Sequence, residues 1–481
     1  MKSGKKTVLY ILSLLLILGF RLIPAPAGMT ASGMQVLGIL LGVLLLWLFE
    51  SIDWPSFLCL AGLTLVPELK IGSILSSSFG NSTFAFLLFT FMCTYAVGQT
   101  SFVKRCAIGF ITNRIASKGS WWFITIYCLS VLLIGMVMSP VVLFVIYMPI
   151  FDSICKELEL EKSDKLANTL VLGTLFCCAI ACGMTPISHT FPIMALGFYQ
   201  QMAGETISYA AYMAAAIPVG LICFAVMMLM FRFVIRPDTS KLHHLNAEKL
   251  KAQIKPMEKR EKWIIGIFFA VVAAWVLPEF LKNILPGVSS FFSAKGTTFP
   301  PMIGAIAMFM ISVDGKPLLN FKEAMSKGIQ WGGLVMAAAT LAVGSAMTNA
   351  DIGLTTWLSG AIEPMLAGLS PMLIVLVFML WTFIMTNSCS NMVTTTVVCA
   401  VAIPICLASG GALNAAATAA MIGMGASYAF VLPPAHPNVA LAIGTGWTNT
   451  SQVIRYGAIL MLTAILASTF VGYPIGTMLM A

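Results

Sequence analysis

The chain has 481 residues, of which 59% are hydrophobic and only 9% are charged, and its mean hydropathy is +0.95. Soluble domains carry about 25% charged residues, so this composition excludes a soluble globular protein and indicates an integral membrane protein. The net charge of +9 does not indicate a nucleic-acid partner, because much of the positive charge lies in one loop and is typical of membrane topology.

Long apolar runs recur along the whole chain, which favours transmembrane helices over barrel strands. Residues 1–78 are expected to form N-terminal scaffold helices. The first run is interpreted as a transmembrane helix, because no clear small-residue cleavage site of a signal peptide follows it. Residues 79–235 form a first unit, in which a hairpin at about 119–151 is broken at Met138-Ser139-Pro140. The apolar segment at about 166–200 is interrupted by a loop that contains two prolines and a histidine.

The second half repeats this order of segments. The strongly basic stretch 236–262 is expected to be a cytoplasmic connector with an amphipathic helix, and residues 263–330 should add scaffold helices. Residues 331–481 form a second unit. In that unit a polar-tipped hairpin at about 371–408 precedes an interrupted segment at about 414–446, so the sequence predicts an internal repeat.

The middle of the second hairpin gathers hydroxyl and amide side chains between apolar flanks. They are Thr386, Asn387, Ser388, Ser390, Asn391 and Thr394 to Thr396. A lipid-facing helix has no need for so many polar groups, whereas backbone that breaks at membrane depth beside a water-filled cavity does. We therefore interpret each hairpin as a re-entrant pair of helices that enters the membrane and turns back.

The two interrupted segments correspond at a constant offset. Pro186 and His189 lie 247 positions before Pro433 and His436. Taken singly, such a proline can be only a kink and such a histidine only a packing residue, but matched interruptions in two units favour a function. An inverted repeat would bring the breaks together near the midplane. There, helix N-termini could hold an anion, and unwound carbonyls with Ser, Thr and Asn oxygens could hold sodium.

The distribution of lysine and arginine predicts an orientation. With the N-terminus in the cytoplasm, about eleven transmembrane helices plus two re-entrant hairpins place the C-terminus outside. The basic loops then all lie inside, at 101–118, 152–165, 234–262 and 314–330. The fold class expected is thus an all-α polytopic protein of the cell membrane, in contact with membrane lipid.

At its hairpin tips and helix breaks the chain resembles the divalent anion/sodium symporter (DASS) family, within the ion transporter superfamily. That family carries Ser-Asn-Thr at each tip, where this chain has Ser390-Asn391-Met392 and Ser139-Pro140-Val141. The resemblance covers nearly the whole length. It implies a homodimer of protomers with a scaffold and a moving transport domain. It further implies an elevator cycle for dicarboxylate, citrate or sulfate, with sodium as the coupling ion and no other cofactor.

The resemblance also implies which residues bind the substrate and the ion. Substrate is expected at Ser139, His189, Thr190, Ser390, Asn391, His436 and Asn438. Sodium in the second half is expected at Thr386, Ser390, Asn391 and the backbone near Ala435. In the first half, sodium is expected at Ser139 and Ser188. There Pro140 replaces the family's asparagine, and proline supplies neither a backbone donor nor a side-chain oxygen. At the two positions where the family has threonines that bind substrate carboxylates, this chain has Val141 and Met392.

Two histidines stand where the family has threonines, and three roles are open for them. Neutral, each donates one hydrogen bond to an anion; protonated, they could couple transport to protons; or they fill a pocket reshaped for another anion, such as sulfate or a sulfonate. A cation/proton antiporter would need a carboxylate at the breaks, and a membrane enzyme would need paired acids or a His/Asp/Glu cluster. The four interruptions contain no acid, so a transporter of small organic anions is predicted and an enzyme is not.

Overall fold

The computed structural model describes residues 3–245, 251–252, 256–354, 357, 360, 368–433 and 435–480. Within these ranges the chain is almost entirely helical, with one antiparallel ribbon formed by β1 (Ser312–Val313) and β2 (Lys316–Pro317). The all-α expectation is therefore confirmed. Ala481 and parts of the expected connector, 246–250 and 253–255, lie outside the described residues, and so does most of the amphipathic helix expected there.

The helices of the first half follow the predicted order. They are α1 (Ser3–Gly19), α2 (Ala31–Phe49), α3 (Trp54–Leu63), α4 (Ile71–Ser77), α5 (Ser82–Gly98), α6 (Phe102–Ile111), α7 (Ser120–Gly135), α8 (Pro140–Glu157), α9 (Lys165–Met184), α10 (Thr190–Ala203), α11 (Tyr209–Met230) and the π-helical turn η3 (Phe231–Ile235). The first hairpin is α7 with α8, and the first interrupted segment is α9 with α10. Helix α8 ends at Glu157, beyond the predicted end at about 151, because its charged end, which looked like a loop, stays helical.

The second half contains the matching elements. They are α13 (Lys259–Leu281), α14 (Pro286–Lys295), α15 (Phe299–Met310), α16 (Phe321–Glu323), η5 (Ala324–Gly328), α17 (Trp331–Thr348), α19 (Pro371–Ser388), α20 (Asn391–Ala408), α21 (Ala415–Ser427), α22 (Pro437–Gly444), α23 (Thr450–Ala467), η6 (Ser468–Gly472) and α24 (Tyr473–Leu479). The second hairpin, α19 with α20, has the predicted bounds. The second interrupted segment is α21 with α22.

One stretch expected to be a loop contains a helix. The predicted loop 101–118 contains α6, in which Val103, Ala107 and Ile108 are buried while Lys104 stays partly exposed. Its apolar residues recur at helical spacing, but the basic residues between them concealed the pattern. Among the helices expected within 263–330 is α14, which Pro286 starts at the first helical position, where proline is favoured.

Eight helices among the described residues are long and apolar enough to cross a membrane. The number is nine if α4 and α5, which are bent by 43° at their junction, form one span. The eight include α9 of the first interrupted segment and both helices of the second hairpin, α19 and α20, whereas α7, α10 and α21 are shorter than 18 residues. The expected total of eleven spans, the re-entrant course of the hairpins and the inverted repeat stay predictions.

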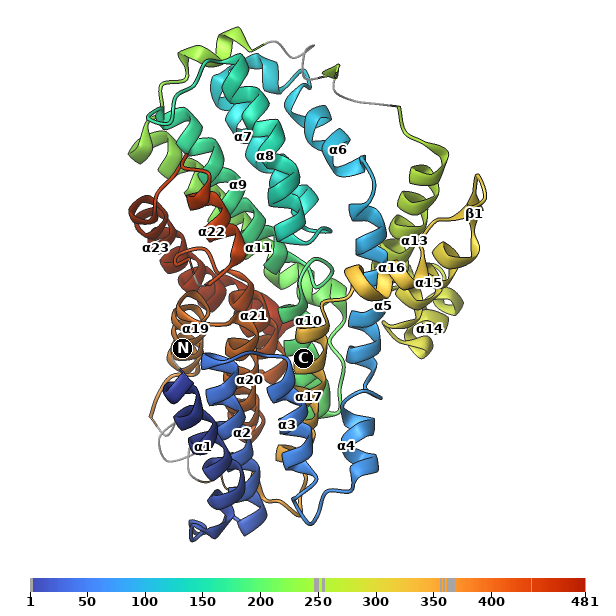
Figure 1. Ribbon diagram of the computed structural model, residues 1–481, viewed down its shortest axis with the longest axis vertical. Helices are drawn as coiled ribbons and strands as arrows, with labels where there is room; N and C mark the ends of the chain where they lie inside the picture. The colour runs from blue at the N-terminus through green and yellow to red at the C-terminus, as the bar shows by residue number, and fades with distance from the viewer. Residues whose placement is uncertain are drawn as a thin grey trace.

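Figure 1 shows α1, α2, α3 and α4 at one end of the molecule and α7, α8 and α9 at the other. Helix α5 runs between these ends and packs against α13, α15 and α17. The two hairpins and the two interrupted segments pack on one another: α10 lies against both α20 and α21, and α9 also contacts α21. The expected division into scaffold and repeat units stays a prediction. Helix α5 lies within 79–235, the range expected for the first repeat unit, yet it packs with α13 and α15 of the expected scaffold.

The first helices of the interrupted segments form the centre of the protein. Every residue of α21 is buried, and so is every residue of α9 after Lys165. Such close packing needs small residues at the contacts. At Gly423 a β-carbon would lie 2.8 Å from both the Cα of Pro192 and the Cβ of Ala195, so glycine allows α21 to touch the start of α10. This packing fixes the two breaks relative to each other.

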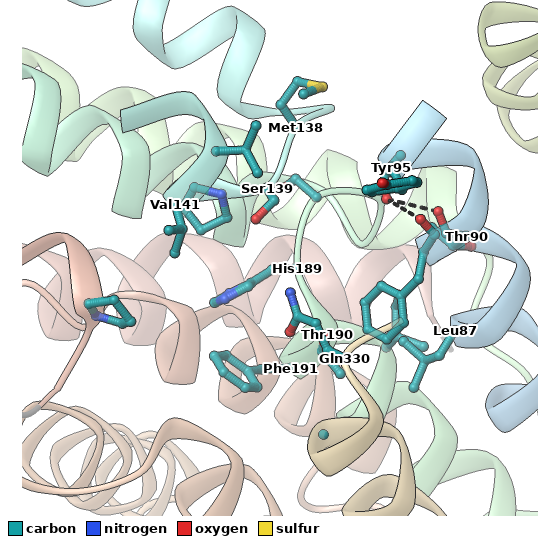
Figure 2. Close-up of a pocket in the computed structure, with 18 of the residues that line it drawn as sticks. Leu87, Thr90, Tyr95, Met138, Ser139, Val141, His189, Thr190, Phe191 and Gln330 are labelled. Carbon is teal, nitrogen blue, oxygen red and sulfur yellow. Dashed lines mark hydrogen bonds between the residues drawn. The ribbon is translucent and has the colours of Figure 1, made fainter. Parts of the chain in front are cut away.

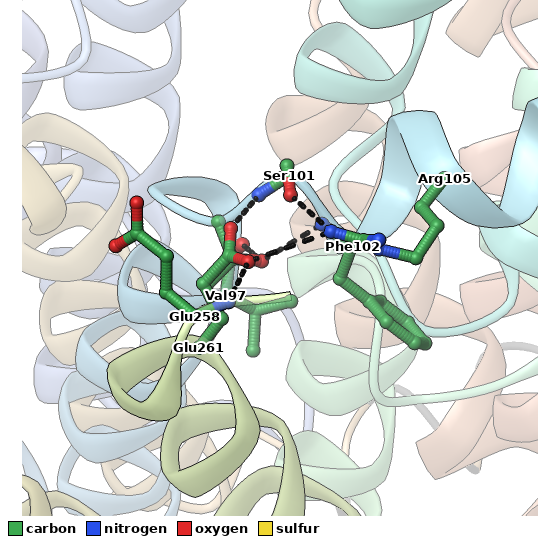
Figure 3. Close-up of polar contacts among 7 residues, drawn as sticks. Val97, Ser101, Phe102, Arg105, Glu258 and Glu261 are labelled. Carbon is green, nitrogen blue, oxygen red and sulfur yellow. Dashed lines mark hydrogen bonds and ion pairs between the residues drawn. The ribbon is translucent and has the colours of Figure 1, made fainter. Parts of the chain in front are cut away.

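The junction between α5 and α6 is fastened to α13 by polar contacts. The carboxylate of Glu261 accepts a 2.6 Å hydrogen bond from the backbone N–H of Ser101, and its other oxygen lies 3.7 Å from Arg105. Figure 3 shows these groups converging where α6 begins. Since α6 packs on α7 and α8, the contact links the first hairpin to the α13 side of the molecule.

Candidate functional site

Both interrupted segments contain a break in which the chain leaves the helix. Helix α9 ends at Met184 and α10 begins at Thr190, while α21 ends at Ser427 and α22 begins at Pro437. Proline cannot donate to the helix ladder, and it disfavours helical geometry in the residue before it, which explains why the chain unwinds at these places. The breaks lie at corresponding points of the two units, as the sequence predicts.

The two hairpin tips are short turns between paired helices. In the second tip, Ser390 precedes α20, and its Oγ accepts from the N–H of Val393 at 3.5 Å, as an N-cap residue does. In the first tip, Ser139 precedes α8 without a side-chain cap, and Pro140 is the first helical residue. Proline fits that position because no helical acceptor exists there for an N–H.

One side chain compensates for the unwound backbone of the second break. The amide oxygen of Asn387 accepts from the N–H groups of Phe430 and Val431 at 3.0 and 2.9 Å, and its Nδ2 donates to the carbonyls of Phe383 and Tyr428. A buried backbone group without a partner is costly. Asn387 therefore supports the break, a role that sequence reasoning missed although it noted the residue among the polar tip residues.

The tips and breaks meet at a cavity of about 640 Å³. Eight of the predicted site residues line it: Ser139, Ser188, His189, Thr190, Ser390, Asn391, Ala435 and His436. Figure 2 shows the first tip and first break on one side of this cavity and α5, with Leu87, Thr90 and Tyr95, on the other. The structure thus brings together residues from both units that are far apart in the sequence.

Two predicted site residues do not line the cavity. Thr386 is buried behind the second tip, where its hydroxyl lies 3.0 Å from Oδ1 of Asn391 and 2.7 Å from the carbonyl of Ala426. Asn438 is buried behind the first tip, and its Nδ2 donates to the carbonyl of Pro140 at 2.9 Å. Each therefore holds a tip against the helix break beside it rather than facing the cavity directly.

The two histidines differ although they occupy corresponding positions. Each directly precedes the second helix of its segment, and their ring centroids are 6.0 Å apart. Nδ1 of His436 accepts the backbone N–H of Asn438 at 3.1 Å. An accepting ring nitrogen carries no proton, so neutral His436 carries its proton on Nε2 and remains a hydrogen-bond donor. His189 makes no such cap, and its Nδ1 has no hydrogen-bond partner in the described chain.

The N-terminus of α22 offers fewer free donors than the sequence suggested. Pro437 has no N–H, and the N–H groups of Asn438 and Val439 are both bonded to His436. The expectation that exposed N–H groups of both half-helices hold an anion is therefore wrong for α22. Helix α10 begins with Thr190 and Phe191, which do carry N–H groups. Because the N–H groups of α22 are occupied, the histidine side chains and the hairpin tips become the main hydrogen-bond donors to an anion.

The cavity contains little charge. Among the described residues that line it, Lys327 has the one charged side chain, and none is acidic. Lys327 is 68% exposed at its side chain, and its Nζ lies 3.4 Å from Oε1 of Glu323, which also accepts from the hydroxyl of Tyr95 at 3.2 Å.

Sequence reasoning missed the wall that α5 and the start of α17 contribute. This wall includes Thr90, Tyr95 and Gln330, and the Thr90 hydroxyl is buried without a hydrogen-bond partner in the described chain. Within the sequence α5 resembles any apolar membrane helix, so only its packing against the breaks reveals that one face lines the cavity.

Comparisons with known proteins agree with this architecture. The profile of the family described as "Sodium:sulfate symporter transmembrane region" matches residues 4–481. The sodium-dependent dicarboxylate transporter SdcS of Staphylococcus saprophyticus is 26% identical over 492 positions, covering 97% of this chain and 89% of the relative. SdcS of Staphylococcus aureus is 27% identical over 456 positions, covering 90% and 84%.

A solved structure shows the same fold. The YdaH transporter of Alcanivorax borkumensis superposes with a TM-score of 0.59 at 12% sequence identity, covering 92% of this chain and 98% of that one. At such low identity the likeness concerns the fold alone. Since the profile spans almost the entire chain, the resemblance stated from the sequence is confirmed: the protein belongs to the sodium:sulfate symporter transmembrane family and is a membrane transporter, not an enzyme.

Proposed function

We propose that this protein is a secondary active transporter that carries a small organic anion, of the dicarboxylate kind or related to it, together with sodium. One observation carries the proposal: both hairpin tips and both helix breaks, through Ser139, Ser390, His189 and His436, line a single cavity. Two relatives named as sodium-dependent dicarboxylate transporters support it. A site assembled from two duplicated units suits alternating access better than it suits catalysis.

The donors around the cavity suit an anion that is bound by neutral groups. Nε2 of His436, the hydroxyls of Ser139 and Ser390 and the amide of Asn391 can each donate to an oxygen of the solute. Because Nδ1 of His436 already accepts from Asn438, protonation of that nitrogen would place two N–H groups against each other. This contact disfavours protonation of His436, and so it favours sodium over protons as the coupling ion.

Sodium is proposed to bind on the second-tip side. Thr386, Ser390 and Asn391 supply side-chain oxygens there, and two of those oxygens are 3.0 Å apart; the carbonyl of Ala435 is a further ligand. Hard cations prefer such oxygen ligands. A first-half site would use Ser139 and Ser188. The Oγ of Ser188 is buried and has no hydrogen-bond partner in the described chain.

The transport cycle is proposed to follow the elevator type. The body that holds both hairpins and both interrupted segments would move as one against the α1–α5 and α13–α17 side, and two protomers would form a homodimer. The protein would lie in the cell membrane with its N-terminus in the cytoplasm and its C-terminus outside.

Uptake into proteoliposomes tests the proposal. Radiolabelled succinate, citrate and sulfate are presented to the purified full chain with a sodium gradient, with a choline gradient and with exchange substrate inside. We expect sodium-dependent accumulation of at least one organic anion. If no anion moves under sodium, proton or exchange conditions, the proposed function is wrong.

A further inference from the structure

We infer that the solute of this cavity carries one anionic group on an apolar body, so that a monocarboxylate binds better than a dicarboxylate. This inference rests on the proposed function and narrows its substrate class. It follows from where the cavity keeps its free hydrogen-bond donors, from the character of the remaining wall, and from the pairing of its one charged residue.

The anionic group has a defined place. His189 and His436 face each other at 6.0 Å between ring centroids, and His436 presents Nε2–H because its other nitrogen caps α22. The tips add Ser139 and Asn391 beside them. These neutral donors come from the tips and breaks alone, and a carboxylate, which accepts about four hydrogen bonds, is enough to satisfy them.

Much of the remaining wall is apolar. Each tip is followed by an apolar side chain that lines the cavity, Val141 in the first and Met392 in the second. Leu87, Phe91 and Ile193 continue this surface. A charged group placed against such side chains loses its hydration without gaining a partner, which is costly, whereas a hydrocarbon body gains from burial there.

Two hydroxyls of the opposite wall are already engaged, whereas the Thr90 hydroxyl and the amides of Gln99 and Gln330 add neutral polar groups there. The Thr94 hydroxyl donates to the carbonyl of Thr90 at 2.9 Å, and Tyr95 donates to Glu323. Lys327 pairs with the same carboxylate at 3.4 Å, so the charge that it can offer to a second carboxylate of the solute is reduced. Among the described residues that line the opposite wall, Lys327 is thus the one cation for a second anionic group, and it is already paired with Glu323.

The size of the cavity suits a solute that carries an apolar body beside its anionic group. Its volume of about 640 Å³ lies within the range of about 300–1,000 Å³ typical of sites for drug-sized ligands. A four-carbon dicarboxylate would leave most of this space to water, in contact with apolar walls.

A matched pair of ligands tests the inference. In 4-methylpentanoate an isopropyl group replaces one carboxylate of succinate, so the two ions have nearly the same shape and differ in one charge. The melting temperature of the purified full chain is measured in sodium chloride against the concentration of each ligand, since a ligand of the folded state raises it. We expect 4-methylpentanoate to bind at least about tenfold more tightly than succinate.

Two double variants make the test specific to the wall. V141T/M392T adds a hydroxyl beside each tip and is expected to shift the preference at least about tenfold toward succinate. V145T/M372T makes the same changes outside the cavity lining, at an exposed and a partly buried position, and should retain the original preference.

The outcomes separate this inference from the proposed function. Tighter binding of 4-methylpentanoate, reversed only in V141T/M392T, supports the inference. Equal or tighter binding of succinate by the unaltered chain overturns it and leaves sodium-coupled anion transport in place. If no anion stabilises the protein and none is taken up with sodium, the proposed function fails, and the inference fails with it.

Discussion

The side-chain amide of Asn438 donates a 2.9 Å hydrogen bond to the carbonyl of Pro140, and so joins the second helix break to the first hairpin tip. In N438D the donor becomes a second oxygen that faces the same carbonyl in a buried place. We expect the variant to lose about 1–3 kcal/mol of stability, the usual cost of an unsatisfied buried group. Thermal denaturation in detergent and anion uptake both report the loss.

N113D is the control for that substitution. The side-chain oxygen of Asn113 accepts from the N–H groups of Ile115 and Ala116, and aspartate keeps both bonds. Its melting temperature should match that of the unaltered chain. An N438D protein as stable and as active as N113D would show that the contact between break and tip has no mechanical role.

Replacing each histidine by alanine should separate their roles. H436A removes the cap of α22, which costs about 1 kcal/mol in typical helices, whereas H189A removes no hydrogen bond made within the described chain. Both variants should reduce anion uptake at least about tenfold, because each loses a donor to the solute.

The measurements for this pair are the melting temperature and the KM for the transported anion. H436N is the matched control, because its side-chain oxygen can again accept the N–H of Asn438, so its stability should return while its uptake stays low. Unchanged uptake in H189A would remove His189 from the substrate site.

Sodium dependence should respond to Thr386. T386V removes the hydroxyl that lies between Asn391 and Ala426, and the sodium concentration for half-maximal uptake is expected to rise about tenfold or more. T382V, one turn earlier in α19, removes a buried hydroxyl that bonds only the carbonyl of Phe378, and should leave that concentration unchanged. An identical sodium curve for T386V would place the ion elsewhere.

The contact between α21 and α10 should tolerate no added side chain at Gly423. In G423A the new β-carbon would lie 2.8 Å from the Cα of Pro192, and backbone cannot yield cheaply, so we expect a loss of about 1–3 kcal/mol. G266A lies in α13 with nothing within 4 Å and should be neutral or gain up to about 1 kcal/mol. Equal melting temperatures for the two variants would contradict this packing.

Much of the fold follows from composition and from the order of polar interruptions. The hairpin 371–408 and the breaks near His189 and His436 were predictable, because proline and clustered small polar residues have no place inside a lipid-facing helix. Helix α6 was not recognised, because its apolar face is short and lies among basic residues that resemble a cytoplasmic loop.

The site was predictable only in part. The residues of the tips and breaks came from motifs, and eight of them line the cavity. The wall formed by α5 depends on three-dimensional packing, for which Thr90 and Tyr95 carry no local signal. Likewise, the cap that distinguishes His436 from His189 is a matter of side-chain geometry, which two matched sequence positions could not reveal.

Asn387 also has a consequence for how the protein is made. The ribosome delivers this asparagine 43 residues before Phe430, the first of the two backbone groups that its oxygen satisfies. Until that later segment emerges, the hairpin carries an amide oxygen whose native partners are not yet made, and hydrocarbon would exclude it. We therefore expect the nascent hairpin to stay in a wet or protein-lined place until the second break has formed.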